Sequence, residues 1–300
     1  MELTSIKTIK GILEKNQTFA KKHFGQNFLV DQNVLNRITE TAEILDTDNI
    51  IEIGPGLGVL TQELAKKAGS VKTIEIDRNI IPILEENLLQ SKIDNTLTEK
   101  EYKKIEIINQ DALKYIPNFE NSNTIKTYKV VANIPYNITS PLITHFLTQK
   151  NKPTTLTLLV QKEVAEKLTT LEPDMTVLSL NTALYADAKY IKKVPPSCFY
   201  PSPKVDSAII KITLRSPQNE NFVPEETAKK ILQIAKTAFS NKRKKLSNTL
   251  KNITNLISSK TNLEVTYEEI VTAAEKSSID LSRRPETLSV KEWQALAENL

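Results

Sequence analysis

Three glycines and two carboxylates in the first part of the chain form its clearest chemical pattern. Gly54, Gly56 and Gly58 follow a short apolar run and precede a stretch with helical periodicity. Glycines between a strand and a helix let a ligand approach the backbone at a helix N-terminus. Glu75 lies 21 positions after Gly54, and Asp111 lies further on, each at the end of a predicted strand. This spacing predicts a nucleotide-type binding loop with two acids beside it.

The two acids indicate which ligand this loop would bind. A carboxylate at Glu75 can accept hydrogen bonds from both ribose hydroxyls, and one at Asp111 can accept from an adenine amino group. The loop carries no lysine to neutralise a pyrophosphate, and its Gly-x-Gly-x-Gly pattern differs from the dinucleotide pattern. An adenosine-bearing ligand without phosphate, of the shape of S-adenosylmethionine, therefore fits better. The alternative is a glycine-bearing turn with solvated acids.

A second chemical segment, 133–136 (Asn-Ile-Pro-Tyr), ends another predicted strand. Ligands of open α/β sheets bind beyond the carboxyl ends of the strands, so this segment should lie near Gly54 and Glu75. The exocyclic amine of a base is a poor nucleophile because its lone pair is delocalised into the ring. The Asn133 side-chain oxygen and a carbonyl next to proline can accept its N–H bonds and aim the lone pair at a methyl group. Tyr136 can stack on a flipped base. The alternative is a turn whose asparagine bonds its own backbone.

Strands and helices are needed to bring these residues together, and the hydrophobic pattern predicts them. The predicted strands are 49–53, 71–77, 105–109, 128–133 and 155–160, and the predicted helices are 33–45, 59–68 and 78–90. Such alternation indicates a parallel sheet covered on both faces, an α/β fold. Asp31 or Asn33 would cap the first helix. The polar stretches 91–104 and 117–127 are expected to be loops or insertions.

The pattern changes after residue 176. The sequence predicts a helix at 177–184, extended segments at 185–194 and 205–215 around a proline-rich corner, and then helices at 224–239, 242–253, 266–276 and 289–299. We therefore expect two domains, an α/β domain at 1–215 and a small all-helical domain at 216–300.

Composition limits the class of protein. The 300 residues carry a net charge of +4 and are typical of a soluble globular chain. No uncharged apolar run is long enough to span a membrane, and the first residues lack the pattern of a secretory signal. The single cysteine, Cys198, excludes an internal disulfide, and two histidines leave little for a metal site. We expect a cytoplasmic protein without a metal.

The motifs together resemble the small-subunit ribosomal RNA adenine dimethyltransferases, the KsgA/RsmA family. The resembling segments are 22–29, 52–58, 75–77, 110–112, 133–138, 160–165, 194–208, 238–239 with 243–246, and 284–289. Each motif alone is modest, whereas all of them in order are highly specific. One departure is the loop 171–176, which has no glycine and two acids where many members have glycine or serine.

This resemblance implies a Rossmann-like methyltransferase domain that uses S-adenosylmethionine, followed by a helical RNA-binding domain. The implied cofactor contacts are Asn27, Leu29, Gly54, Glu75, Asp111 and Asn133. Tyr136, and Phe199 in the proline corner, are implied to sandwich the target adenine. The basic residues Lys242, Arg243, Lys244 and Lys245, which would open a helix, are implied to contact phosphates.

The implied reaction is dimethylation of N6 on two adjacent adenines near the 3′ end of 16S rRNA, during small-subunit maturation. The implied partners are small-subunit rRNA and the pre-30S particle, and we expect a monomer. One alternative is a 23S rRNA adenine N6-methyltransferase of the macrolide-resistance type. Another is a non-catalytic RNA-binding relative, which would not need an intact 133–136 segment.

Overall fold

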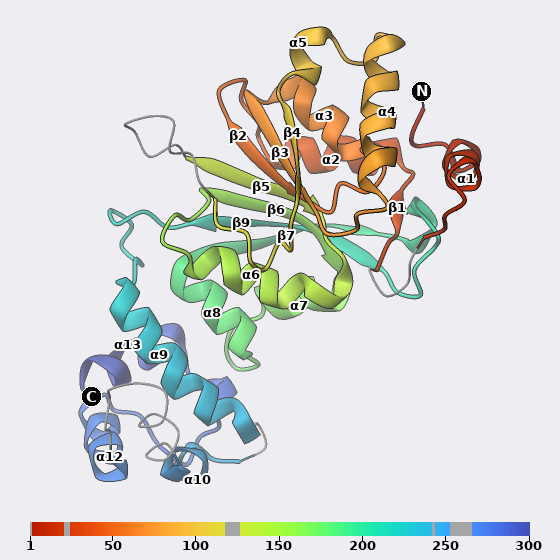
Figure 1. Cartoon of the computed structure of the whole chain (residues 1–300). Helices are drawn as coiled ribbons and strands as arrows, with labels where there is room; N and C mark the ends of the chain where they lie inside the picture. Colours follow the sequence, from red (N-terminus) through yellow and green to blue (C-terminus); the bar gives the residue numbers. More distant parts are fainter. Residues whose placement is uncertain (1, 21–24, 118–126, 242–243, 253–265) are drawn as a thin grey trace. The chain divides into compact units, whose positions relative to one another are not determined.

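The computed structural model describes residues 2–20, 25–117, 127–241, 244–252 and 266–300 (Figure 1). Contacts divide the chain into two compact units: the first holds 1–165 and 189–214, and the second holds 166–188 and 215–300. The division after residue 214 lies one residue from the predicted domain boundary after residue 215. The segment 166–188, which the sequence analysis left in the first domain, groups by contacts with the C-terminal helices.

A seven-stranded sheet has the order β4-β3-β2-β5-β6-β9-β7. Its strands are β2 (Asn49–Ile53), β3 (Ser70–Glu75), β4 (Ile105–Asn109), β5 (Tyr128–Asn133), β6 (Thr155–Gln161), β7 (Ala186–Val194) and β9 (Ser207–Leu214). The strands β2 to β6 pair in parallel, and β9 runs antiparallel to β6. The predicted α/β sheet is therefore confirmed, with each strand within two residues of its expected bounds.

The strand order reverses at β2, which lies between β3 and β5. Ligands of open α/β sheets bind at such a switch point, beyond the carboxyl ends of the strands. The glycine loop follows β2, Glu75 ends β3 and Asn133 ends β5. The topology thus brings together the three groups that the sequence analysis singled out.

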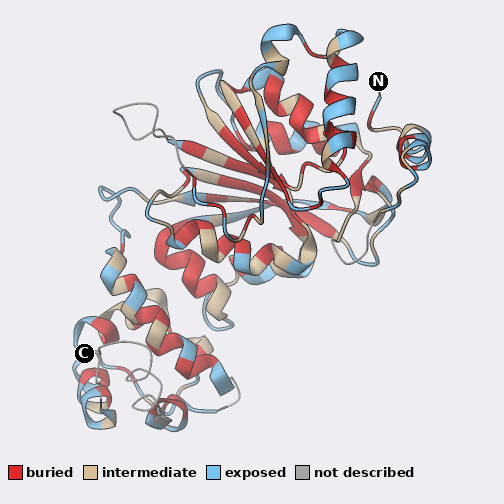
Figure 2. Ribbon diagram, viewed as in Figure 1, coloured by how far each residue is buried: buried red, intermediate tan, exposed pale blue. Residues whose placement is uncertain are grey.

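Helices cover both faces of this sheet within the first unit. They are α2 (Gln32–Thr41), α3 (Val59–Lys67), α4 (Ile81–Ile93) and the short α5 (Glu99–Tyr102) on one side and α6 (Thr139–Thr148) on the other (Figure 1). Asp31 caps α2, because its carboxylate accepts from the Val34 N–H at 3.0 Å. Leu35, Ile38 and Leu64 are almost fully buried, so the helix stripes and the strands form the core (Figure 2).

Three local elements differ from the sequence prediction or were absent from it. The helix α1 (Ile6–Lys15) was not predicted, although Ile9, Ile12 and Leu13 form a buried stripe at helical spacing. The stretch 91–104 is not simply a loop, since it holds the end of α4 and all of α5, with Thr98 as a capping-box residue. The strand β1 (Phe28–Leu29) pairs with β8 (Phe199–Tyr200), which joins the N-terminal region to the proline corner.

In its described residues, the second unit is helical apart from the start of β7. Its elements are the end of α7 (Lys162–Thr169), α8 (Val177–Tyr185), α9 (Glu225–Ala238), η4 (Phe239–Asn241), α10 (Leu246–Thr249), η5 (Leu250–Asn252), α12 (Tyr267–Lys276), η6 (Pro285–Thr287) and α13 (Val290–Glu298). Its core includes Trp293, fully buried, whose ring stacks on Phe239 with centroids 6.1 Å apart. None of the helices in the described ranges is long and apolar enough to span a membrane.

The predicted helix at 242–253 is wrong in its start. Lys242 and Arg243 lie outside the described residues, and α10 begins only at Leu246, with Lys245 as its N-cap. A helix with four cations in its first turn would oppose its own dipole, so a later start is physically reasonable. The described lysines Lys244 and Lys245 precede the helix and are exposed.

Candidate active site

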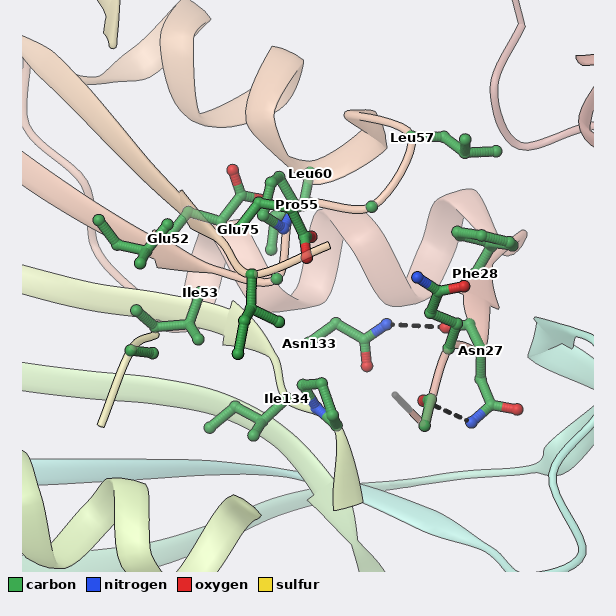
Figure 3. Close-up of a pocket in the computed structure, with 18 of the residues that line it drawn as sticks. Asn27, Phe28, Glu52, Ile53, Pro55, Leu57, Leu60, Glu75, Asn133 and Ile134 are labelled. Carbon is green, nitrogen blue, oxygen red and sulfur yellow. Dashed lines mark hydrogen bonds between the residues drawn. The ribbon is translucent and has the colours of Figure 1, made fainter. Parts of the chain in front are cut away.

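A cavity of about 300 Å³ opens in the first unit at the switch point of the sheet (Figure 3). Its wall includes every predicted cofactor residue and one of the two predicted stacking residues: Asn27, Leu29, Gly54, Glu75, Asp111, Asn133 and Tyr136. Leu3 and Ile9, from the unpredicted N-terminal region, complete the apolar part of the wall. The structure therefore brings together residues that are more than a hundred positions apart.

The glycine loop needs glycine for conformational and steric reasons. Gly54 has φ +66° and donates its N–H to the Ile74 carbonyl at 3.0 Å, which ties the loop to β3. Gly58 has φ +94° and serves as the N-cap of α3. A Cβ atom on Gly58 would lie 2.8 Å from Leu84 Cδ1, so α3 and α4 pack too closely for a larger residue. The loop thus holds bare backbone and the start of α3 beside the cavity.

Glu75 ends β3 and is almost buried, with 7% of its surface exposed. Burial raises the pKa of its carboxyl above the ordinary value, and the charge of Asp77 acts in the same direction. The Asp77 backbone N–H donates to Glu75 Oε1 at 2.8 Å and lowers the pKa. This bond fixes the carboxylate at the cavity wall, where it can accept hydroxyl hydrogen bonds.

Glu52 is a cavity residue that the sequence analysis missed. It lies in β2 and lines the cavity with only 1% of its surface exposed. Burial raises the pKa of Glu52 to about 8, and the charge of Glu75 adds to the increase. The Thr61 hydroxyl donates to Glu52 at 2.7 Å, which lowers the pKa in part. A glutamate between two isoleucines of a buried strand is the signal that could have identified it.

The cavity carries acids and no bases among its described lining residues. Glu52, Glu75 and Asp111 supply three carboxyls, and no lysine, arginine or histidine lies in the described wall. Asp111 Oδ1 accepts from the Leu113 N–H at 2.9 Å, which orients this carboxylate. The described wall therefore offers no positive group to a phosphate, and its carboxylates at Glu75 and Asp111 favour a cation. The residues therefore fit S-adenosylmethionine, which combines a sulfonium, an ammonium group and adenosine without phosphate.

Asn133 has a fixed side-chain orientation. Its Nδ2 donates to the backbone carbonyl of Asn27 at 3.1 Å. A backbone carbonyl only accepts, so the amide must turn its nitrogen to Asn27 and its oxygen away from it (Figure 3). Within the described residues, no hydrogen bond to the Ile134 carbonyl is found either. The segment thus offers two acceptor oxygens, the arrangement expected for binding an amine.

Tyr136 presents its ring rather than its hydroxyl. It begins the 3₁₀ turn η2 (Tyr136–Ile138) and lines the cavity. Its hydroxyl shares a 2.6 Å hydrogen bond with Ser207 Oγ, and Ser207 is fully buried in β9. Burial raises the pKa of Tyr136, while the bond to Ser207 lowers it. With its hydroxyl anchored, the ring has a defined position for stacking.

Phe199 does not line the cavity in this structure. It is 2% exposed, pairs with Leu29 across the β1–β8 ribbon, and belongs to a hydrophobic core cluster with Leu29 and Ile209. Neighbouring residues of a strand face opposite sides, which turns Phe199 inward and leaves Tyr200 half-buried. Its stacking role stays a prediction that would require it to move. Cys198 beside it is buried, and burial raises the pKa of its thiol to about 11, so it is not a reactive thiolate.

Five residues of the predicted motifs lie outside the described residues: Lys22, His23, Phe24, Lys242 and Arg243. In the described ranges no group of three or more His, Cys, Asp or Glu residues is arranged to hold a metal ion.

The sheet and the cavity together define an S-adenosylmethionine-dependent methyltransferase. The family model for ribosomal RNA adenine dimethylase matches residues 17–295, so the chain belongs to that family. A curated relative from Alkaliphilus oremlandii, named ribosomal RNA small subunit methyltransferase A, is 37% identical and covers 99% of this chain and 98% of its own length. One of the same name from Clostridium botulinum is 40% identical and covers 96% of this chain and 97% of its own length.

The solved structures that resemble this chain include a 23S rRNA methyltransferase and a dimethyladenosine transferase. The 23S rRNA methyltransferase ErmE is 27% identical, with a TM-score of 0.64, and the match covers 91% of this chain and 99% of ErmE. A dimethyladenosine transferase from Plasmodium falciparum, 24% identical, shows the same fold with a TM-score of 0.69 over 89% of this chain and 95% of its own. Identity is higher to the small-subunit enzymes than to ErmE. This difference favours the small-subunit reading over the 23S alternative, and the chain is an rRNA adenine dimethyltransferase.

Proposed function

We propose that this enzyme dimethylates N6 of two adjacent adenines near the 3′ end of small-subunit rRNA during maturation of the subunit. The names of the curated relatives support the small subunit as the source of the substrate. The observation that carries the chemistry is the orientation of Asn133, whose amide nitrogen is held by the Asn27 carbonyl. That orientation leaves an acceptor oxygen for the amine of an adenine.

The cavity residues would hold the cofactor through its adenosine and its positive charge. When bound, S-adenosylmethionine supplies an activated methyl group on a cationic sulfur. Glu75 would accept from the ribose hydroxyls, and Asp111 from the adenine amino group. The Gly54 turn permits close approach to the backbone, and Ile76, half-exposed at the wall, offers an apolar surface to a purine ring.

The segment 133–136 would hold the target base. The Asn133 oxygen and the Ile134 carbonyl accept the two N–H groups of the amine, which draws the nitrogen toward tetrahedral geometry. The Tyr136 ring, anchored by Ser207, stacks on the flipped base. Catalysis then consists mainly of positioning and of exclusion of water by the apolar wall. No residue has to act as a strong general base.

The cellular setting is part of the same proposal. We infer action on the pre-30S particle, in the cytoplasm, by a monomer. The helical C-terminal region would bind RNA, with Lys244 and Lys245 among the phosphate contacts, since both are exposed and precede α10. We also propose that this RNA-binding domain begins near residue 215.

Transfer of labelled methyl groups to purified subunits tests the proposal. Unmethylated small subunits should accept methyl groups from S-adenosylmethionine, and large subunits should not. Label found in 23S rRNA would favour the ErmE-like alternative. Binding to subunits with no transfer of label would favour a non-catalytic RNA-binding protein.

A further inference from the structure

Five consecutive residues, 25–29, form one wall of the cavity. Gln26 is bonded to Asp77, which follows β3, and Asn27 is bonded to Asn133, which ends β5. Because β2 lies between β3 and β5, this segment passes across the ends of three neighbouring strands. The cofactor side and the substrate side of the site are therefore joined by one short stretch of backbone.

Asp77 is well placed to hold this segment. It is 3% exposed, and it is not among the described residues that line the cavity. Its Oδ2 accepts from Gln26 Nε2 at 3.1 Å, and its Oδ1 accepts from the Asn79 backbone N–H at 3.1 Å. Its own N–H holds the Glu75 carboxylate. The two oxygens thus tie the segment to the same turn that positions the predicted ribose acid.

At the other end of the segment, Asn27 determines the orientation of the Asn133 side-chain amide. The Asn27 carbonyl is the acceptor that keeps the Asn133 nitrogen turned away from the substrate amine. If the segment shifts, the amide can rotate by half a turn and present N–H groups where an acceptor is needed. Two donors facing each other would leave the amine poorly bound.

We infer that the hydrogen bond between Gln26 and Asp77 is a positioning device for Asn133, acting through the backbone of Asn27. Gln26 and Asp77 are positioning residues under this assignment, and the inference rests on the proposed role of Asn133 in binding the amine. Under this assignment, loss of the hydrogen bond between Gln26 and Asp77 slows methyl transfer only in enzymes that retain Asn133, because Asn133 is the side chain that it misorients.

A double-mutant cycle on the full chain tests this claim. We would measure single-turnover methyl transfer to unmethylated small subunits, and cofactor affinity by calorimetry, for Gln26→Met, Asn133→Ala and the double variant. Gln26→Met keeps the length of the side chain and removes its donor. It should slow wild-type transfer by about 10-fold and the Asn133→Ala enzyme by less than about twofold, because small misplacements of reacting groups are costly. Cofactor affinity should weaken less than the rate in Gln26→Met, because Glu75 and Asp111 keep their places although Asn27 and Leu29 lie in the shifted segment.

A reversed pair provides the rescue. Gln26→Glu alone places two carboxylates in contact and should slow transfer. Adding Asp77→Asn lets the new amide at position 77 donate to the new carboxylate at position 26, and should restore the rate to within about threefold. Asn79→Ala is the control, because Asn79 bonds to Asp77 through its backbone N–H, which alanine retains. This variant should transfer methyl groups at the wild-type rate.

The outcomes separate this inference from the proposed function. Equal slowing of the wild-type and Asn133→Ala enzymes by Gln26→Met would overturn the positioning role while leaving the function of Asn133 intact. Failure of Asp77→Asn to rescue Gln26→Glu would count against it in the same way. Near-normal turnover by Asn133→Ala alone would overturn the role of Asn133 and this inference with it.

Discussion

The side chain of Asn133 donates to the backbone carbonyl of Asn27 across 106 positions of sequence, at 3.1 Å. One residue ends the strand β5, and the other lies in the segment before β1. A backbone carbonyl cannot donate, so this contact turns the amide nitrogen of Asn133 toward Asn27 and its oxygen away from it. Under the proposed role of Asn133, the chemistry of the site depends on the main-chain carbonyl of Asn27.

Asn133→Ala should slow methyl transfer by on the order of 100-fold, because the amine loses an oriented acceptor. Cofactor affinity should weaken much less than the rate. Single-turnover transfer and calorimetry on the same preparation measure both quantities. A normal rate in the alanine variant would remove Asn133 from the mechanism.

Glu75→Gln should weaken S-adenosylmethionine binding at least about tenfold, since hydrogen bonds to a charged group contribute about 1.5–3 kcal/mol. The glutamine keeps the shape of the side chain and can still accept from the Asp77 N–H, so the loop should keep its fold. Calorimetry gives the affinity. An unchanged value would mean that the ribose binds elsewhere.

Glu52 should make stability depend on pH. Its pKa is raised to about 8 in the folded protein, so the folded state holds a proton that the unfolded state releases near pH 4.5. Its contribution to the free energy of unfolding should therefore fall as pH rises from about 4.5 to about 8, by on the order of a few kcal/mol. Urea unfolding at pH 5 and pH 8 should show this loss in the wild type and not in Glu52→Gln. Parallel pH dependence of the two proteins would place the Glu52 pKa near its ordinary value.

Gly58→Ala should destabilise the protein by about 1–3 kcal/mol, because it combines a left-handed backbone with a clash against Leu84. Gly11→Ala is the matched control, since a Cβ there meets nothing within 4 Å and Gly11 lies inside α1. That change should be neutral or stabilising by up to about 1 kcal/mol. Equal thermal shifts for the two variants would show that the tight loop does not need glycine at position 58.

Replacing Lys242, Arg243, Lys244 and Lys245 by glutamine should weaken binding to small subunits. It should also flatten the log–log salt dependence by roughly two or three units. Binding of free S-adenosylmethionine, which the cavity of the first unit would hold, should stay the same. A wild-type salt slope in this variant would mean that the cluster is only a solvated surface.

Sequence reasoning predicted the parallel strands closely because each is a short apolar run between polar segments; β2, β4 and β5 match the predicted bounds. It also predicted that Gly54, Glu75 and Asn133 would meet at one edge of the sheet, since the topology of such sheets is restricted. The helix at 242–253 was misplaced because periodicity alone cannot show where a helix begins without a capping residue.

Tertiary packing explains most of what the sequence did not reveal. The burial of Phe199 depends on the pairing of β1 with β8. Strands of two residues are too short to be predicted from the sequence pattern. The Gln26–Asp77 bond joins segments 51 positions apart and has no local signature. Glu52 could have been predicted as a site residue from the sequence, because burying an acid inside an apolar strand is costly and therefore indicates a function.

Nucleoside analysis of the product tests whether this enzyme dimethylates two adjacent adenines of small-subunit rRNA. Unmethylated small subunits would be incubated with S-adenosylmethionine and the wild-type or Asn133→Ala chain, and the rRNA fragments analysed by mass spectrometry. We expect two neighbouring N6,N6-dimethyladenosines near the 3′ end with the wild-type enzyme and strongly reduced modification with the variant. Modification at another site, of another base, or at equal levels by both proteins would contradict it.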